Sequence, residues 1–488
     1  MKLARFVNRL LAAVIPLLLL PAVCFGGDTQ NLPDFGDSAG SVVSPEYERR
    51  LGQAIMRQAR RYANLVRDPE VDSYINSVGY QLVANSDDNQ IPFNFFVIDD
   101  ARVNAFAAPG GVIGINSGVI LNSRDESELA GVLAHEIAHV TQRHMARTFE
   151  KADQFSIPSA AALIGAIALG IANPQAGVAA VALASGLSAQ AQINFTRANE
   201  EEADRVGMKL LARSGFDPRG MPEFFQRLQH ASKYYQGNAP EYLRTHPLTT
   251  SRIADSIARA EQYPKKEYTS SINFKLVRAK LLVHNAEEPG DAIKIFEQRL
   301  GDERLTDKDP ERYGYALALT AADEFNRAQE QLRYLLEKEP ENSAYLLAAA
   351  DLESARRNFN AAIAFYDKAY TLYPDYRPVI YKYARALLDA KQPARAREIL
   401  RKYGRDHEPD LYYFDLLSQA EAQTGHPAEA GIAKAEYYYL SGETQLAIDR
   451  LKYAQRQTPL DYYQEERVSA RLAQLEYELQ LEKELDIR

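Results

Sequence analysis

Two histidines four residues apart are the residues of this sequence that most directly suggest chemistry. His135 and His139 lie in the apolar run LAGVLAHEIAHVTQRHM (129–145), with Glu136 beside the first of them. On a helix, residues four apart share one face, so both imidazoles can reach one ion while Glu136 faces the same mouth. Zinc hydrolases need this H-E-x-x-H spacing, because two ligands hold the metal and a carboxylate takes a proton from water. The alternative is a buried helix that merely contains polar residues.

A third ligand decides between these interpretations. The metzincin pattern would place Gly at 142 and His at 145, but the chain has Gln142 and Met145. His144 follows His139 by five residues, which is roughly 140° around a straight helix. We therefore expect His144 outside the metal shell, at the surface or as a supporting residue.

The run TRANEEEADRVGMKLL (196–211) has helical apolar spacing and contains Glu200 and Asp204. A carboxylate from this separate helix would complete a His-His-Glu site and leave the fourth position open for water, as catalytic zinc requires. Asp204, one turn further on, can accept the other ring N–H of a ligand histidine and fix its tautomer. Glu201 and Glu202 compete with Glu200 as ligands, although a solvated helix face is the simpler interpretation for both.

The motifs HEIAH and EEEAD, followed by THPLTTSRI (245–253), resemble those of the M48 zinc metallopeptidases. The resemblance implies one Zn²⁺ per chain, held by His135, His139 and Glu200. It also implies that Glu136 is the general base and that Asp204 orients a ligand histidine. His246, in the motif H-P-x-x-x-x-R, is implied as a group at the open coordination position.

Two features could restrain such a peptidase. His246 could take the fourth position on zinc and displace the catalytic water; its removal would then raise proteolysis, or lower it if the imidazole also steadies the oxyanion. The second feature is the segment 154–196, which has no charged residue and is interrupted by Pro158 and Pro174. We expect two helices there that are buried or cover the site, with reversible membrane contact as the alternative.

The N-terminal 27 residues have the pattern of a secretory signal peptide. Three basic residues precede an uncharged run (10–27) that is short for a membrane anchor and contains two prolines. Cleavage would remove Cys24, the only cysteine, whose lipidation is a weaker alternative because the flanking residues do not fit. Residues 28–44 are expected to form a flexible leader.

Residues 45–265 are expected to form the peptidase domain. Apolar spacing predicts two helices over 45–88, and aromatic and β-branched residues predict three short strands, at 91–99, 103–111 and 112–122. A substrate is expected to pair in extended form with the strand around 112–119. A capping box of Ser123 and Glu126 predicts that the motif helix begins at Ser123 and continues through His144.

Residues 266–488 repeat with a 34-residue period. Small residues recur at Ala316, Ala350 and Ala384 and again at Ala328, Ala362 and Ala396, and bulky residues recur at Leu332, Tyr366 and Leu400. This is the tetratricopeptide pattern, in which small residues lie where paired helices cross closely. The predicted fold class is therefore mainly α: an α+β protease domain with a small sheet, followed by an all-α tetratricopeptide solenoid.

The leader, the repeats and the motifs together resemble periplasmic members of the M48 family. The resemblance implies quality control and assembly of outer-membrane β-barrel proteins, with unfolded or misassembled barrels as clients and the barrel assembly machinery as a further partner of the repeats. A chaperone or scaffold with a mostly latent protease site is the alternative. The net charge of −9, without a long basic block, argues against nucleic acid as a partner.

Overall fold

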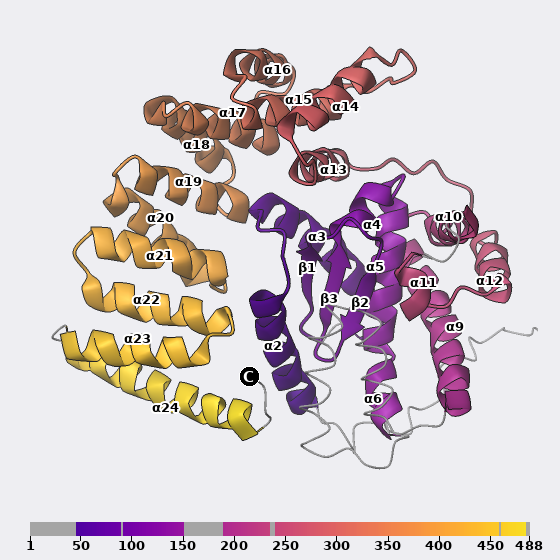
Figure 1. The fold of residues 1–488 in the computed structure, drawn as a ribbon, viewed down its shortest axis with the longest axis horizontal. Coiled ribbons are helices and arrows are strands. Elements are labelled where there is room, and N and C mark those ends of the chain that lie inside the picture. The colour runs from indigo at the N-terminus through magenta and orange to yellow at the C-terminus, as the bar shows by residue number, and fades with distance from the viewer. Residues whose placement is uncertain (1–44, 89–90, 151–188, 235–239, 458–459, 485–488) are drawn as a thin grey trace, which may run out of the picture. The chain divides into compact units, whose positions relative to one another are not determined.

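The computed structural model describes residues 45–88, 91–150, 189–234, 240–457 and 460–484. The predicted signal peptide and leader, and residues 154–188 of the uncharged segment, lie outside these residues. Within them the fold is mainly α, with one small sheet in the peptidase domain, as predicted (Figure 1). Among the described helices, none combines the length and the apolar composition that crossing a membrane requires.

Two helices precede a three-stranded sheet, as the apolar spacing predicts. The helices are α2 (Pro45–Tyr62) and α3 (Pro69–Val83). The strands are β1 (Asn94–Ile98), β2 (Ala105–Ala108) and β3 (Val112–Asn116), in the order β1-β3-β2. β3 pairs in parallel with β1 and in antiparallel with β2. Because both edges of β3 are occupied, the prediction that a substrate pairs with the strand around 112–119 is wrong.

The third strand is also shorter than predicted, because residues 117–122 form helix α4 (Ser117–Asn122). The register explains the change of structure. Asn116 is opposite Ile98, the last residue of β1, and Ile115 is opposite Ala105, the first residue of β2. Beyond Asn116 both strand ladders end, although the Gly118 N–H still donates to the Asp100 carbonyl just after β1 at 2.9 Å, and the residues that follow form a helix.

The motif helix α5 (Glu126–Thr141) differs from the prediction at both ends. Its N-cap is Asp125, whose carboxylate accepts from the Glu128 N–H at 3.0 Å, while the Ser123 hydroxyl donates to the Val119 carbonyl at the end of α4. The predicted start at Ser123 is therefore wrong. The helix also ends before His144: Arg143 has a φ of 50°, and α6 (His144–Glu150) begins directly after it.

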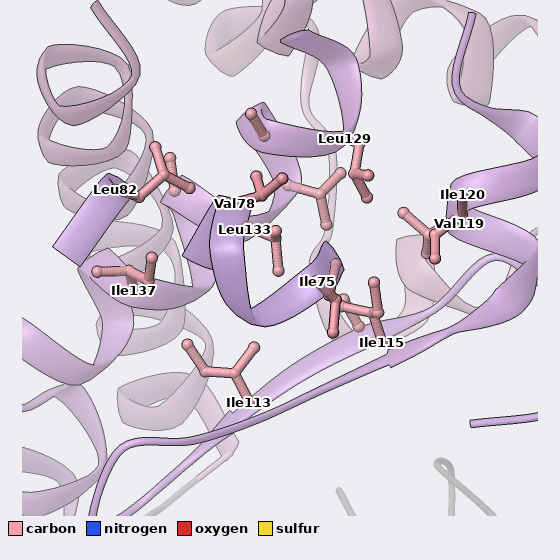
Figure 2. Close-up of a cluster of buried hydrophobic side chains, with 14 of the residues drawn as sticks. Ile75, Val78, Leu82, Ile113, Ile115, Val119, Ile120, Leu129, Leu133 and Ile137 are labelled. Atoms are coloured by element: carbon pink, nitrogen blue, oxygen red, sulfur yellow. The ribbon is translucent and has the colours of Figure 1, made fainter. Parts of the chain in front are cut away.

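In the core of the peptidase domain, α5 packs against α3, β3 and α4. Figure 2 shows side chains of α3, β3, α4 and α5 directed toward one another, among them Ile75, Ile113, Val119 and Leu133. All four of these side chains are fully buried. Burial of an aliphatic side chain contributes about 1.5–3 kcal/mol, so this cluster fixes the helix that carries the motif.

The remaining helices of the domain are α9 (Ala189–Arg213), α10 (Gly220–Tyr234), α11 (Tyr242–Thr245) and α12 (Thr250–Ala260). α9 lies along α5, and Gly207 of α9 faces the backbone of α5. A Cβ at this position would lie 3.0 Å from the carbonyl oxygen of Ala134, the residue before His135. The absence of a side chain at Gly207 thus allows the two helices to approach.

The C-terminal half consists of helix pairs, and the predicted tetratricopeptide positions are buried. Every one of the recurring alanines is fully buried, and the bulky recurring residues are no more than 2% exposed. α13 also contributes Phe274, Val277 and Leu281 to the core of the peptidase domain. The helices are α13 (Ile272–His284), α14 (Pro289–Gly301), α15 (Asp309–Ala321), α16 (Phe325–Lys338), α17 (Ser343–Ala355), α18 (Phe359–Leu372), α19 (Arg377–Asp389), α20 (Pro393–Asp406), α21 (Leu411–Gln423), α22 (Pro427–Leu440), α23 (Thr444–Gln457) and α24 (Tyr462–Glu484).

Gly207→Ala should destabilise the protein by about 1–3 kcal/mol, because backbone atoms of α5 must move away from the new Cβ. Gly290→Ala is the matched control, since Gly290 is also helical and has nothing near its Cβ position. That control should be neutral or stabilise by up to about 1 kcal/mol. Urea unfolding of both variants measures the difference, and equal stability of the two would contradict the close packing.

Candidate metal centre

Four potential metal ligands from three separate parts of the chain converge at one point. His135 and His139 come from α5, Glu200 comes from α9, and His246 is the C-cap of α11. One ligand atom from each residue lies within 4.8 Å of all the others. The three predicted ligands and the predicted occupant of the open position are therefore brought together.

The separations of the donor atoms fit one metal ion. The Nε2 atoms of His135 and His139 are 3.0 Å apart, and each is 3.4 Å from a carboxylate oxygen of Glu200. Nδ1 of His246 lies 3.4 Å from Nε2 of His135 and 3.0 Å from Oε1 of Glu200. A tetrahedral ion with bonds of about 2.0–2.2 Å separates its donors by roughly 3.3–3.6 Å. The set therefore suits a four-coordinate divalent metal.

Glu136 lies beside this cluster and is fully buried. Neither of its carboxylate oxygens has a hydrogen-bond partner within the described residues. Nε2 of His246 is 3.4 Å from Oε1 of Glu136. A buried carboxylate without hydrogen bonds is costly unless a positive charge or a ligand is near, so its position suits a group that acts on a metal-activated water.

Asp204 supports the ligand His135, as predicted for a carboxylate one turn after Glu200. Its Oδ1 lies 3.0 Å from Nδ1 of His135, the ring nitrogen opposite the donor Nε2. A neutral imidazole that binds metal through Nε2 carries its proton on Nδ1, so in that state the proton of His135 is on the nitrogen next to Asp204. The interaction fixes both the tautomer and the orientation of the ring.

Arg252 is a functional residue to which the sequence pattern assigned no role. It is 2% exposed and donates to both oxygens of Asp204, from Nε at 2.7 Å and from Nη2 at 2.8 Å. Nη1 lies 2.9 Å from Oε2 of Glu200. Arg252 is the last residue of the H-P-x-x-x-x-R motif (246–252), so the motif itself contained the signal.

The electrostatics reflect this crowding of charge. Burial alone would raise the pKa of the Glu200 carboxyl, but the charge of His246 and hydrogen bonds from His135 and His139 hold it well below its usual range. Burial likewise lowers the pKa of His135, but hydrogen bonds to Asp204 and Glu200 outweigh it and raise the value to about 10. Without a metal, the imidazole of His135 is therefore protonated on both ring nitrogens at physiological pH. Its positive charge then lies where a metal cation would otherwise lie.

The neighbours of the ligands differ partly from the prediction. Glu201 is exposed, as expected for a solvated face, but Glu202 is only 27% exposed and contacts His144 and Arg147. The solvated interpretation of Glu202 is therefore wrong. His144 is not a donor of the cluster, as predicted, and it is buried against His139. Burial lowers the pKa of His144 to about 4, so its imidazole is neutral at physiological pH.

Known proteins of similar sequence share both halves of the chain. Residues 69–259 match the model of peptidase family M48, and residues 354–420 match that of a tetratricopeptide repeat. The β-barrel assembly-enhancing protease of Escherichia coli K12 is 38% identical over 96% of both chains. That of Yersinia pestis is 35% identical over 94% of this chain and 96% of its own.

A more distant relative matches a smaller part of the chain. The mitochondrial metalloendopeptidase OMA1 of Schizosaccharomyces pombe is 28% identical over 214 residues, which are 43% of this chain and 60% of its own. Peptidases of the M48 family depend on a metal ion, and the four-donor cluster lies inside the matched region. The chain is therefore a metallopeptidase of family M48 and belongs to the same family as the β-barrel assembly-enhancing proteases.

Proposed function

We propose that the chain is a periplasmic zinc endopeptidase that acts in quality control and assembly of outer-membrane β-barrel proteins. The observation that carries the proposal is the buried carboxylate of Glu136 next to four convergent metal donors. The names of the relatives, β-barrel assembly-enhancing proteases, supply the clients. Unfolded or misassembled barrels are the substrates, and the repeats recruit them.

Zinc is the metal that we propose for the site, with one ion per chain. His135, His139 and Glu200 are the ligands, since two imidazoles and a carboxylate form the donor set of many zinc hydrolases. A divalent ion would also balance the buried charge. The site holds three buried carboxyl side chains (Glu136, Glu200 and Asp204) and one buried guanidinium (Arg252).

The chain's own groups account for the remaining steps of hydrolysis. Zinc, when bound, supplies a Lewis acid that activates water and polarises the substrate carbonyl. Glu136 accepts the proton of the attacking water at a carboxylate oxygen and can deliver it to the leaving amine. Arg252 holds Asp204, and Asp204 keeps Nε2 of His135 free of its proton and available to the metal.

An extended substrate can pair with β2 rather than with β3. Within the described residues β2 has a strand partner on one side only, and it packs against α5. Main-chain pairing at such an edge gives affinity without demanding a particular sequence. This mode of binding favours unfolded or strand-forming clients.

Three further predictions belong to the proposal. The peptidase domain is assigned to 45–265 and the repeat domain to 266–488, after a signal peptide over 1–27 and a leader over 28–44. The repeats also bind the barrel assembly machinery. The third is the role of the segment 154–196, as a cover of the active site or in peripheral membrane contact, and it concerns mostly residues outside those that the structure describes.

A second candidate function, chaperone or scaffold, is favoured by one specific observation. His246 fills the fourth position of the cluster, which a working hydrolase needs for water. A peptidase held in this state would be latent, and the repeats could then assist assembly without cleavage. The two functions are compatible within one chain.

Glu200→Gln should remove most of the bound zinc from the purified mature protein and abolish proteolysis, because an amide is a poor metal ligand. Glu201→Gln is the matched control one residue away, on an exposed position, and should retain both. Elemental analysis after dialysis measures the metal. Equal zinc contents of the two variants would exclude Glu200 as a ligand.

Glu136→Gln should retain zinc and lower casein digestion by roughly 10²–10⁴-fold, because the general base is lost. The same variant separates the two candidate functions. If it supports outer-membrane protein assembly in cells as well as the unaltered protein does, the scaffold function predominates. A variant that still digests casein at the original rate would refute the role of Glu136.

His246→Ala should raise proteolysis, because it empties the fourth position while three ligands keep the metal. The stacking of the His246 ring on buried Tyr242, with centroids 4.7 Å apart, shows how the resting position is held. A lower rate with unchanged zinc would instead mean that the imidazole steadies the oxyanion. An unchanged rate, together with unchanged zinc coordination by X-ray absorption, would rule out a regulatory role.

A further inference from the structure

The second ligand histidine, His139, has a polar partner of its own, formed by a break in the motif helix. On a continuous helix His144 would point roughly 140° away from His139. Instead α5 ends at Thr141, Arg143 adopts the left-handed φ of 50°, and α6 starts at His144. The ring of His144 meets that of His139 edge to face, with centroids 4.8 Å apart. Left-handed φ is uncommon for a residue other than glycine, so the break is a specific feature.

The contact joins Nδ1 of His144 to Nδ1 of His139, the ring nitrogen of His139 that does not lie with the metal donors. Nε2 of His139 is the atom that lies with the donors, 3.0 Å from Nε2 of His135. Its Nδ1 lies 2.8 Å from Nδ1 of His144. If Nε2 of His139 binds a metal as a neutral imidazole, its proton must be on Nδ1. His144 must then accept through Nδ1, and its own proton is on Nε2.

Glu202 completes this arrangement from α9. Its Oε2 lies 3.1 Å from Nε2 of His144, where it can accept the remaining proton. The same oxygen accepts from Nη2 of Arg147 at 2.6 Å. The hydrogen bonds therefore run in one direction, from His139 through His144 to Glu202.

The arrangement parallels the one at the first ligand. Nδ1 of His135 lies 3.0 Å from Oδ1 of Asp204, and Asp204 is held by Arg252. For His139, the imidazole of His144 lies between the ligand and the carboxylate. That carboxylate, Glu202, is again held by an arginine, Arg147. Partners of this kind orient ligand histidines and raise their basicity, and removing one typically weakens metal binding 10- to 100-fold.

We propose that His144 and Glu202 are positioning residues that fix the ring orientation and the metal-binding tautomer of His139. The inference rests on the proposed metal site and deepens it. It gives a function to the helix break after Thr141 and to the one glutamate of the EEEAD motif that is neither a ligand nor exposed. It also means that α9 supports both ligand histidines, through Asp204 and through Glu202.

The test is the zinc affinity of the purified full-length mature protein, measured by competition with a chromophoric chelator, with zinc alone as the probe. His144→Phe fills a similar volume without ring nitrogens and should weaken zinc binding roughly 10- to 100-fold. His144→Gln retains one acceptor and one donor, so it should recover much of the affinity. The melting temperature of the metal-free protein should change little, which separates positioning from a general loss of structure.

Glu202→Ala and Glu201→Ala form the matched pair on α9, and they decide the matter if His144→Phe does not fold. Glu202→Ala should weaken zinc binding several-fold, and Glu201→Ala should not. Equal zinc affinities in these two variants, or a His144→Phe affinity within twofold of the unaltered protein, would overturn the proposal. Failure of the proposed zinc site would look different, because the unaltered protein would then bind zinc no better than Glu200→Gln.

Discussion

The close approach of α9 to α5 is the constraint on which the metal centre depends. Gly207 leaves room for the backbone of α5 at Ala134. At this separation Glu200 and Asp204, one helical turn apart, reach opposite nitrogens of the same imidazole, that of His135. One helix pair thus supplies three metal donors and the carboxylate that orients one of them. A small outward movement of α9 would weaken all of these contacts together.

The same approach concentrates negative charge where water cannot screen it. Glu136, Glu200 and Asp204 are each no more than 4% exposed, and Arg252 is the buried guanidinium among them. Removing carboxylates from water costs several kcal/mol per ion, and a single cation cannot offset three of them. The raised pKa of His135 shows one response, since it takes a proton. A divalent ion would offset the negative charge more completely, so binding a metal there would also stabilise the helix pair.

The sequence predicted what depends on periodicity and local pairing, and failed where tertiary contacts decide. The H-E-x-x-H spacing placed His135 and His139 together, and the 34-residue period located the buried repeat positions. The capping box at Ser123 was wrong because Asp125 stands closer to the helix and caps it instead. The helix break before His144 could not be predicted, since no glycine or proline marks it and the left-handed residue is Arg143. For Arg252 the motif was visible, but only the fold shows that its guanidinium meets Asp204 and Glu200.

On the proposed function, the segment from Tyr242 to Arg252 carries both a group that would block the site and a group that builds it. His246 is the fourth potential donor of the cluster, whereas Arg252 is tied to Asp204 and Glu200 and also donates to the Pro247 carbonyl at 2.8 Å. Withdrawal of the whole segment would therefore dismantle the support of His135 along with the block. If His246 is to leave the cluster while Arg252 keeps its contacts, the movement must be confined to His246 and the residues before it. The imidazole could rotate off Tyr242, or α11 could shift. The short helix α11 is joined to the rest of the domain through the Tyr242 N–H and the Val103 carbonyl, next to β2. On the proposed function, a peptide that pairs with the edge of β2 would bind beside α11, the helix whose C-cap is His246.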